Sequence, residues 1–146
     1  HDEKLAVAEA LGADRTINIR EEAAMDVIES YTDGDGVDVA IDASGAPSAI
    51  DTAIQGVRAG GTVVLYGFSS ELTVSFDAVE AIRNELTIQG AFRYANTYDD
   101  AISLVAAGDI DVGSIIDFEM PLAAVGPAFE RVIEDDVVKG MISLDR

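Results

Sequence analysis

Apolar and polar positions follow two different periods along the 146-residue chain. REEAAMDVIESYT (20–32) repeats its apolar residues every three or four positions, as a helix with one buried face does. TVVLYG (62–67) is a continuous β-branched run, typical of a strand that is buried on both faces. These periods predict helices over 3–11, 20–32, 46–61, 77–84, 97–108 and 122–135. They predict strands over 15–19, 37–44, 62–67, 72–76, 85–92, 115–120 and 137–144.

The predicted strands and helices alternate and are joined by short loops. This order is typical of parallel strands that are connected by right-handed crossover helices. It predicts an α/β fold built on an open parallel sheet. The least structured position along the chain lies near residues 94–96.

Three strand ends carry the candidate binding residues, because ligands of open parallel sheets bind beyond the carboxyl ends of the strands. Here these ends read DASGAP (42–47), LYGFSS (65–70) and GAFRYAN (90–96). A glycine after a strand is most often structural. Three small-residue turns at the same edge of one sheet nevertheless predict a pocket, with Gly45 permitting a close backbone approach before a helix N-terminus.

The net charge of the chain restricts the partners that it can bind. The chain has 28 acidic and 9 basic residues and a net charge of −19. Nucleic-acid binding is excluded, because so few basic residues cannot neutralise phosphates. Many acids with only two lysines, Lys4 and Lys139, resemble proteins from salt-loving organisms, in which molar salt screens the self-repulsion.

The chain lacks the residues that several kinds of catalytic and metal site require. The chain has no cysteine and its single histidine is His1, so it cannot form a disulfide or a Cys/His zinc site alone. Asp38 and Asp42 alternate on a strand beside a turn, and we do not expect them to act as a catalytic pair. Ser44 has no histidine partner that would make it a nucleophile. The G-x-G-x-x-G fingerprint is absent, since the glycines of DGDG (33–36) precede a strand instead of following one.

The opening of the chain and its hydropathy bear on location. No apolar run reaches the roughly 18–20 residues that a membrane span needs. The chain opens HDEKLAV, with neither a signal peptide nor an initiator Met. We therefore expect a cytoplasmic protein with no membrane partner, cut from a longer chain.

Four segments together resemble the C-terminal part of the medium-chain, zinc-dependent alcohol dehydrogenases. They are EKLAVAEALGAD (3–14), VDVAIDASGAP (37–47), VRAGGTVVLYGF (57–68) and ELTIQGAFRYANTY (85–98). The FRYANT cluster (92–97) is similar to the sorbitol and xylitol dehydrogenase branch in particular. The resemblance implies the second part of a Rossmann-type doubly wound sheet without its first two strands, over 1–94. Over 95–146 it implies helix and strand elements that return toward the catalytic domain.

The same resemblance assigns roles to individual residues. It implies a cofactor contact for Lys4 beside the adenosine ribose, and a substrate contact for Tyr94. The other implied contacts are Ser44, Gly45 and Ala46 on the ribose side, Tyr66, Gly67 and Phe68 at the nicotinamide end, and Ala91, Phe92 and Arg93 at the carboxamide, with Arg93 also reaching the substrate. An alternative reading of Arg93 and Tyr94 is a surface cation–π pair.

The resemblance also implies an activity for the full-length protein. We expect an enzyme that passes a hydride from a polyol or secondary alcohol to NAD rather than NADP, with zinc ligands outside this chain. The fragment alone should be inactive. Two alternatives stay open: a zinc-free quinone or enoyl reductase of the same superfamily, and a non-catalytic nucleotide-sensing α/β domain.

Missing strands have consequences for pairing. In the sheet order that the resemblance implies, strands 15–19 and 137–144 have lost their partners, and we expect both to pair abnormally, swap between protomers or fray. Segment 72–76 resembles an edge strand that pairs across a dimer axis, which predicts a homo-oligomer; the alternative is a solvated loop.

Overall fold

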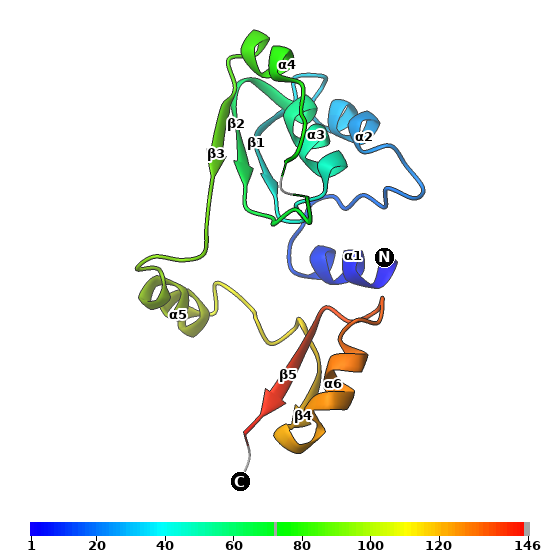
Figure 1. Cartoon of the computed structure of the whole chain (residues 1–146), viewed down its shortest axis with the longest axis vertical. Coiled ribbons are helices and arrows are strands. Elements are labelled where there is room, and N and C mark those ends of the chain that lie inside the picture. Colours follow the sequence, from blue (N-terminus) through cyan, green and yellow to red (C-terminus); the bar gives the residue numbers. More distant parts are fainter. Residues whose placement is uncertain (72, 145–146) are drawn as a thin grey trace. The chain divides into compact units, whose positions relative to one another are not determined.

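The computed structural model describes residues 1–71 and 73–144, which form two compact units (Figure 1). The sheet unit is Ile19–Arg93. The terminal unit combines His1–Asn18 with the chain from Tyr94 onward. None of the helices in the described ranges is long and apolar enough to cross a membrane.

The sheet unit is a parallel sheet with crossover helices, as predicted. Its elements are α2 (Ala24–Tyr31), β1 (Val37–Asp42), α3 (Pro47–Gly56), β2 (Val57–Leu65), α4 (Ala78–Arg83) and β3 (Thr87–Gly90). The three strands lie side by side in the order β1-β2-β3. Asp42 pairs with Leu65, and Leu65 with Gly90, so all three strands end at the same level.

The core of the sheet unit lies between α3 and the sheet. Ile50 and Ile54 of α3 are buried together with Val57 and Val63 of β2. Pro47 stands in the first turn of α3, where its missing N–H has no helical partner to lose. This packing fixes the start of α3, and with it the turn that joins α3 to β1.

The terminal unit has its own parallel pair of strands. Its elements are α1 (Asp2–Ala10), α5 (Tyr98–Ala107), β4 (Ile116–Pro121), the 3₁₀ turn η1 (Leu122–Ala124), α6 (Val125–Arg131) and β5 (Lys139–Ser143). The chain crosses from β4 through α6 to β5, which pairs parallel to β4. The Phe118 ring lies over Gly140, where a Cβ atom would come within 2.4 Å of the ring.

Two of the strand predictions fail in the same way. Residues 15–19 and 73–76 have no strand pairing, and Leu72 lies outside the described residues. Backbone groups of an extended segment need a neighbouring strand, and neither segment finds one among the residues that the structure describes. Near the first segment, side chains bond instead: the Thr16 hydroxyl donates to Glu9 at 2.6 Å and the Asn18 amide to Asp2 at 2.7 Å. The prediction of 15–19 as a strand is thus wrong, and whether this segment frays or swaps between protomers stays a prediction.

The expectation that 137–144 has lost its partner is wrong. β5 pairs with β4 from Ile116–Lys139 to Pro121–Ser143, with one irregularity between Ile116 and Phe118. The partner strand and the crossover helix both lie within the C-terminal segment, so the β4–β5 pair forms from residues of this chain.

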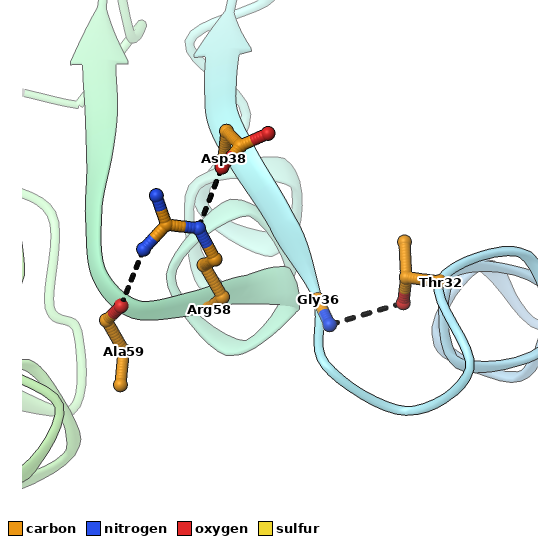
Figure 2. Close-up of polar contacts among 5 residues, drawn as sticks. All are labelled: Thr32, Gly36, Asp38, Arg58 and Ala59. Atoms are coloured by element: carbon orange, nitrogen blue, oxygen red, sulfur yellow. Dashed lines mark hydrogen bonds and ion pairs between the residues drawn. The ribbon is translucent and has the colours of Figure 1, made fainter.

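The predicted helix 46–61 is too long at its C-terminal end. α3 ends at Gly56, and residues 57–61 belong to β2. Val57 pairs with Val37 and is buried, which outweighs the helical pattern of the preceding residues. Figure 2 shows the consequence for Arg58, whose Nε donates to Asp38 on β1 at 2.6 Å and whose Nη1 donates to the Ala59 carbonyl at 2.8 Å.

The turn that precedes β1 is held by a side chain of α2's C-cap residue. The Thr32 hydroxyl donates to the Ile28 carbonyl at 2.7 Å. It also accepts from the Gly36 N–H at 3.0 Å (Figure 2). Gly36 has a φ of 86°, a conformation that glycine adopts without strain. The DGDG segment is therefore a structural turn into β1.

Candidate functional site

The carboxyl edge of the β1-β2-β3 sheet carries three turns that are tied together by main-chain hydrogen bonds. The Asp42 carbonyl at the end of β1 accepts from the N–H groups of Tyr66 at 2.9 Å and Gly67 at 2.8 Å. The Leu65 carbonyl at the end of β2 accepts from the Ala91 N–H at 2.9 Å. The turn after β2 is thereby anchored to the end of β1, and the turn after β3 to the end of β2.

The side chain of Asp42 organises the first of these turns. It is only 4% exposed. Its carboxylate accepts from the Ser44 N–H at 3.0 Å, the Ser44 hydroxyl at 2.9 Å and the Gly45 N–H at 3.0 and 3.1 Å. A buried carboxylate needs such partners, because burying a charge without hydrogen bonds costs several kcal/mol.

Two glycines let the turns after β1 and β2 pack main chain against main chain. A Cβ atom on Gly45 would lie 2.3 Å from the Phe68 carbonyl carbon, and one on Gly67 would lie 2.1 Å from the Gly45 nitrogen. Gly45 also has a φ of 71°. The close approach that Gly45 permits is therefore taken by the neighbouring turn.

An open cavity of about 340 Å³ lies over the ends of β2 and β3. Its lining residues are Leu65, Tyr66, Gly67, Phe68, Ser69, Glu71, Ala91 and Phe92. The Phe68 and Phe92 rings meet edge to face, with centroids 5.6 Å apart, and are 77% and 64% exposed. Exposed aromatic rings beside main-chain polar groups suit a planar ligand that carries an amide.

The residues after the cavity divide between the two units. The Arg93 guanidinium lies over the Phe92 ring, 4.8 Å from its centroid, and Arg93 has a φ of 55°. Tyr94 instead meets Tyr98 edge to face at 4.9 Å. A hydrogen bond with the Tyr94 side chain raises the pKa of Tyr98, and desolvation raises it further. Arg93 thus makes its cation–π contact with Phe92, not with Tyr94.

The structure gathers many of the predicted site residues at one edge. Five of them line the cavity: Tyr66, Gly67, Phe68, Ala91 and Phe92. Ser44 and Gly45 lie in the adjoining turn, and the Ala46 N–H donates to the Ser44 hydroxyl at 3.1 Å. Lys4 of α1 and Tyr94 belong to the terminal unit, so the cofactor contact of Lys4 and the substrate contact of Tyr94 stay predictions.

Sequence reasoning missed the part that Asp42 plays. Asp38 and Asp42 act separately, since Asp38 pairs with Arg58 and Asp42 holds the turn. The available signal was D-x-S-G at a strand end, because an aspartate that bonds to backbone two and three residues later forms an Asx turn. The cavity also includes Ser69 and Glu71, which the sequence did not single out.

The described residues hold no candidate metal centre: nowhere in 1–71 and 73–144 do three His, Cys, Asp or Glu side chains gather. Ser44 is engaged in the turn through both its hydroxyl and its N–H. The edge therefore offers contacts for a ligand, with aromatic faces, backbone polar groups and a nearby guanidinium.

Comparison with known proteins agrees with this geometry. The family model described as zinc-binding dehydrogenase matches residues 1–107. The chain is 41% identical over 131 residues to a putative D-xylulose reductase of Rhizobium meliloti, covering 90% of this chain and 38% of that protein. It is 34% identical over 145 residues to a sorbitol dehydrogenase of Bacillus subtilis, covering 98% of this chain and 41% of that protein. The chain thus spans about two fifths of the length of these relatives.

Solved structures of dehydrogenases are also similar to this chain. A putative zinc-binding dehydrogenase from Sinorhizobium meliloti, bound to NADP, is similar with a TM-score of 0.86 and 25% identity, over 98% of this chain and 43% of that one. A short chain alcohol dehydrogenase from Escherichia coli, complexed with NADH, is similar with a TM-score of 0.84 and 25% identity, over 99% of this chain and 42% of that one.

Proposed function

The chain belongs to the zinc-binding dehydrogenase family, and from this premise we propose that it is the cofactor-binding part of an NAD-dependent polyol or secondary-alcohol dehydrogenase. The observation that carries the proposal is the aromatic cavity at the carboxyl edge, whose lining comes from the turns after β2 and β3. Relatives named for sorbitol and xylulose support a sugar alcohol as the substrate.

The residues at the cavity fit a nicotinamide ring. A carboxamide needs one acceptor and one donor in a plane, and main-chain groups of Tyr66, Phe68 and Phe92 would supply them. Because the Tyr66 N–H is engaged by the Asp42 carbonyl, the contact from Tyr66 falls to its own carbonyl oxygen. When bound, the cofactor accepts a hydride from the carbon that bears the alcohol.

Arg93 and Tyr94 are the proposed substrate contacts. The planar guanidinium of Arg93 presents several donors in a fixed fork, which suits a substrate with adjacent hydroxyl groups. Stacking on Phe92 holds this fork next to the cavity. We place the zinc ligands, which would polarise the alcohol, in the part of the relatives that this chain does not cover. Residues 1–146 alone should therefore be inactive.

The test uses the protein expressed from its complete reading frame. Reduction of NAD and of NADP is followed in molar salt with sorbitol, xylitol and simple secondary alcohols, before and after zinc is stripped with a chelator. Oxidation of polyols with NAD that is lost with the chelator would support the proposal. Chelator-insensitive reduction of quinones or enones, with no alcohol oxidised, would assign the protein to the zinc-free reductases instead. Cofactor binding without turnover of any of these substrates would favour a sensor domain.

We also propose that residues 72–76 pair with the same segment of a second copy. Residues 73–76 have no strand partner in the described ranges 1–71 and 73–144, and Phe76 is 41% exposed. An unpaired segment with apolar side chains is open to edge-to-edge pairing. Light scattering on the protein and on Phe76→Lys should show a dimer for the former and a monomer for the latter.

A further inference from the structure

We propose that Asp42 is a positioning residue for the nicotinamide cofactor, because it joins the turn after β1 to the turn that lines the cavity. The inference rests on the proposed function, since it takes the cofactor to bind at this edge of the sheet. Asp42 itself lines no part of the cavity. Its influence would pass entirely through the two turns.

The first observation is the burial of the Asp42 carboxylate. Among the residues that the structure describes, Asp42 is the one charged side chain that is buried. A charge in this place costs free energy that an apolar residue would not, and strong hydrogen bonds have to offset it. All of the bonds that the structure gives this carboxylate come from Ser44 and Gly45. The buried charge thus defines one conformation of a single turn.

The second observation is that the same residue also holds the turn after β2. The main-chain carbonyl of Asp42 accepts from both Tyr66 and Gly67. One residue therefore anchors residues 44–45 through its side chain and residues 66–67 through its backbone.

The third observation is the tight contact between the two turns. Neither Gly45 nor Gly67 has room for a Cβ atom against the other turn. A shift of the Ser44–Gly45 main chain must therefore move the main chain of 67–68, and residues 65–69 form much of the cavity wall. Packed main chains transmit such shifts because they have no free volume to absorb them.

The test is Asp42→Asn in the protein expressed from its complete reading frame. Asparagine keeps the shape of the side chain, but it replaces one of the two oxygens that accept from the Gly45 N–H by an NH₂ group, which cannot accept. We expect the KM for NAD and the Kd for NADH, measured by its fluorescence, each to rise about tenfold or more. At saturating NAD, kcat and the KM for the polyol should stay within about twofold of wild type.

Asp77→Asn is the matched control. The Asp77 carboxylate also accepts two main-chain N–H bonds, from Val79 at 2.9 Å and Glu80 at 3.1 Å, but it does so at the start of α4. This variant makes the same chemical change outside the cavity, so its Kd for NADH should equal that of wild type. A second variant, Asp42→Ser, keeps an oxygen at this position but removes the carboxylate that accepts from Ser44 and Gly45, and it should raise the same Kd about threefold or more.

Each outcome of these binding measurements either supports or overturns the proposed role of Asp42. A Kd for NADH in Asp42→Asn within about twofold of wild type, or equal to that of Asp77→Asn, overturns the inference while leaving the proposed function standing. Where Asp42→Asn does not fold, an unchanged Kd in Asp42→Ser overturns the inference and a raised one supports it. A wild-type protein that neither binds NADH nor reduces NAD overturns the inference together with the proposed function.

Discussion

Gly67 stands where the turn after β2 meets the turn after β1, with no space for a side chain. A Cβ atom there would lie 2.1 Å from the Gly45 nitrogen and 2.6 Å from the Ser44 carbonyl carbon. Both contacts are with main chain, so no side-chain rotation can relieve them. The residue is therefore required by the packing of the two turns.

Replacing Gly67 by Ala should lower the free energy of unfolding by about 1–3 kcal/mol, as overpacking does, because the turns must separate. Gly90→Ala, at the end of β3, is the control, since a Cβ atom there meets nothing within 4 Å. It should be neutral or stabilise the protein by up to about 1 kcal/mol, because glycine is unfavourable in a strand. Urea denaturation of both variants measures the difference, and equal stabilities would contradict the packing argument.

Arg93 makes a second prediction at this scale. In Arg93→Lys the fork of donors becomes a single point charge, so the KM for sorbitol or xylitol should rise about tenfold while that for a simple secondary alcohol changes less than about twofold. Arg83→Lys, in the last turn of α4, is the control and should change neither value. Equal effects of Arg93→Lys on both classes of alcohol would mean that Arg93 does not recognise adjacent hydroxyl groups.

Among the elements, the β4–β5 pair is held by a side chain as well as by its ladder. The Asp117 carboxylate accepts from the N–H groups of Val138 at 2.6 Å and Lys139 at 2.9 Å, where β5 begins. The bonds from Lys139 and Val138 hold the pKa of Asp117 below its ordinary value, and the charges of Arg131 and Lys4 add to them against the opposing effect of desolvation. The start of β5 thus depends on an ionised carboxylate.

This dependence predicts how the β4–β5 pair responds to acid. Because the pKa of Asp117 is lower in the folded state, its stabilisation is complete above the ordinary value of 3.8 and is lost as the pH falls through the lowered pKa. In Asp117→Asn, amide hydrogen exchange over 137–143 should be faster than in wild type near neutral pH. This gap between the exchange rates of variant and wild type should close in acid, where the carboxylate of the wild type is protonated. Glu119→Gln removes a charge from the same strand and should show no such gap; a gap that is constant with pH would exclude the carboxylate as its cause.

The elements also show what the hydrophobic pattern can and cannot predict. The parallel order and the level strand ends follow from the alternation of helices and strands, and they placed Tyr66, Phe68, Ala91 and Phe92 at one edge. The local pattern of residues 57–61 continues the predicted helix 46–61, whereas the pairing of Val57 with Val37 makes them part of β2. Long-range pairing of this kind leaves no local period in the sequence.

The sequence predicts the position of the site and several of its residues, but not the contacts between them. Turn glycines and aromatic residues mark the cavity, since they stand out after apolar strands. The hydrogen bonds of Asp42 were not found, because a strand-end aspartate looks the same in sequence whether it is solvated or buried. Nor could the pattern tell that Arg93 stacks on Phe92, which depends on the left-handed conformation of Arg93.

For the whole molecule, the dominant quantity is charge. With 28 acidic and 9 basic residues the excess is 28 − 9 = 19 negative charges. Internal ion pairs cannot remove this excess, and one of them, Arg58–Asp38, is an exposed pair of the kind that contributes about 0–1 kcal/mol. Self-repulsion therefore opposes folding unless salt screens it, and at about 1 M salt the Debye length is only ~3 Å.

We accordingly expect the protein to need concentrated salt. Helical circular dichroism should fall when the protein is diluted from molar salt into dilute buffer, and it should return when the salt is restored. Sucrose at equal osmolarity is the control, because it supplies no ions. An unchanged spectrum in dilute buffer would show that the acidic surface is not destabilising.

The parallel pairings described above also have a consequence in time. All three strand pairs of the described chain are parallel, so the partners in each pair are separated by a helix and its loops. Val37 cannot meet Val57 through a tight turn; the intervening residues, including α3, must first be brought into a closed loop. Non-local contacts of this kind slow folding, because the entropy of closing the loop is lost before the pairing is gained. Synthesis of β1 is thus followed by an interval in which the edge of β1 that pairs with β2 has no partner. This interval ends only when β2 has left the ribosome.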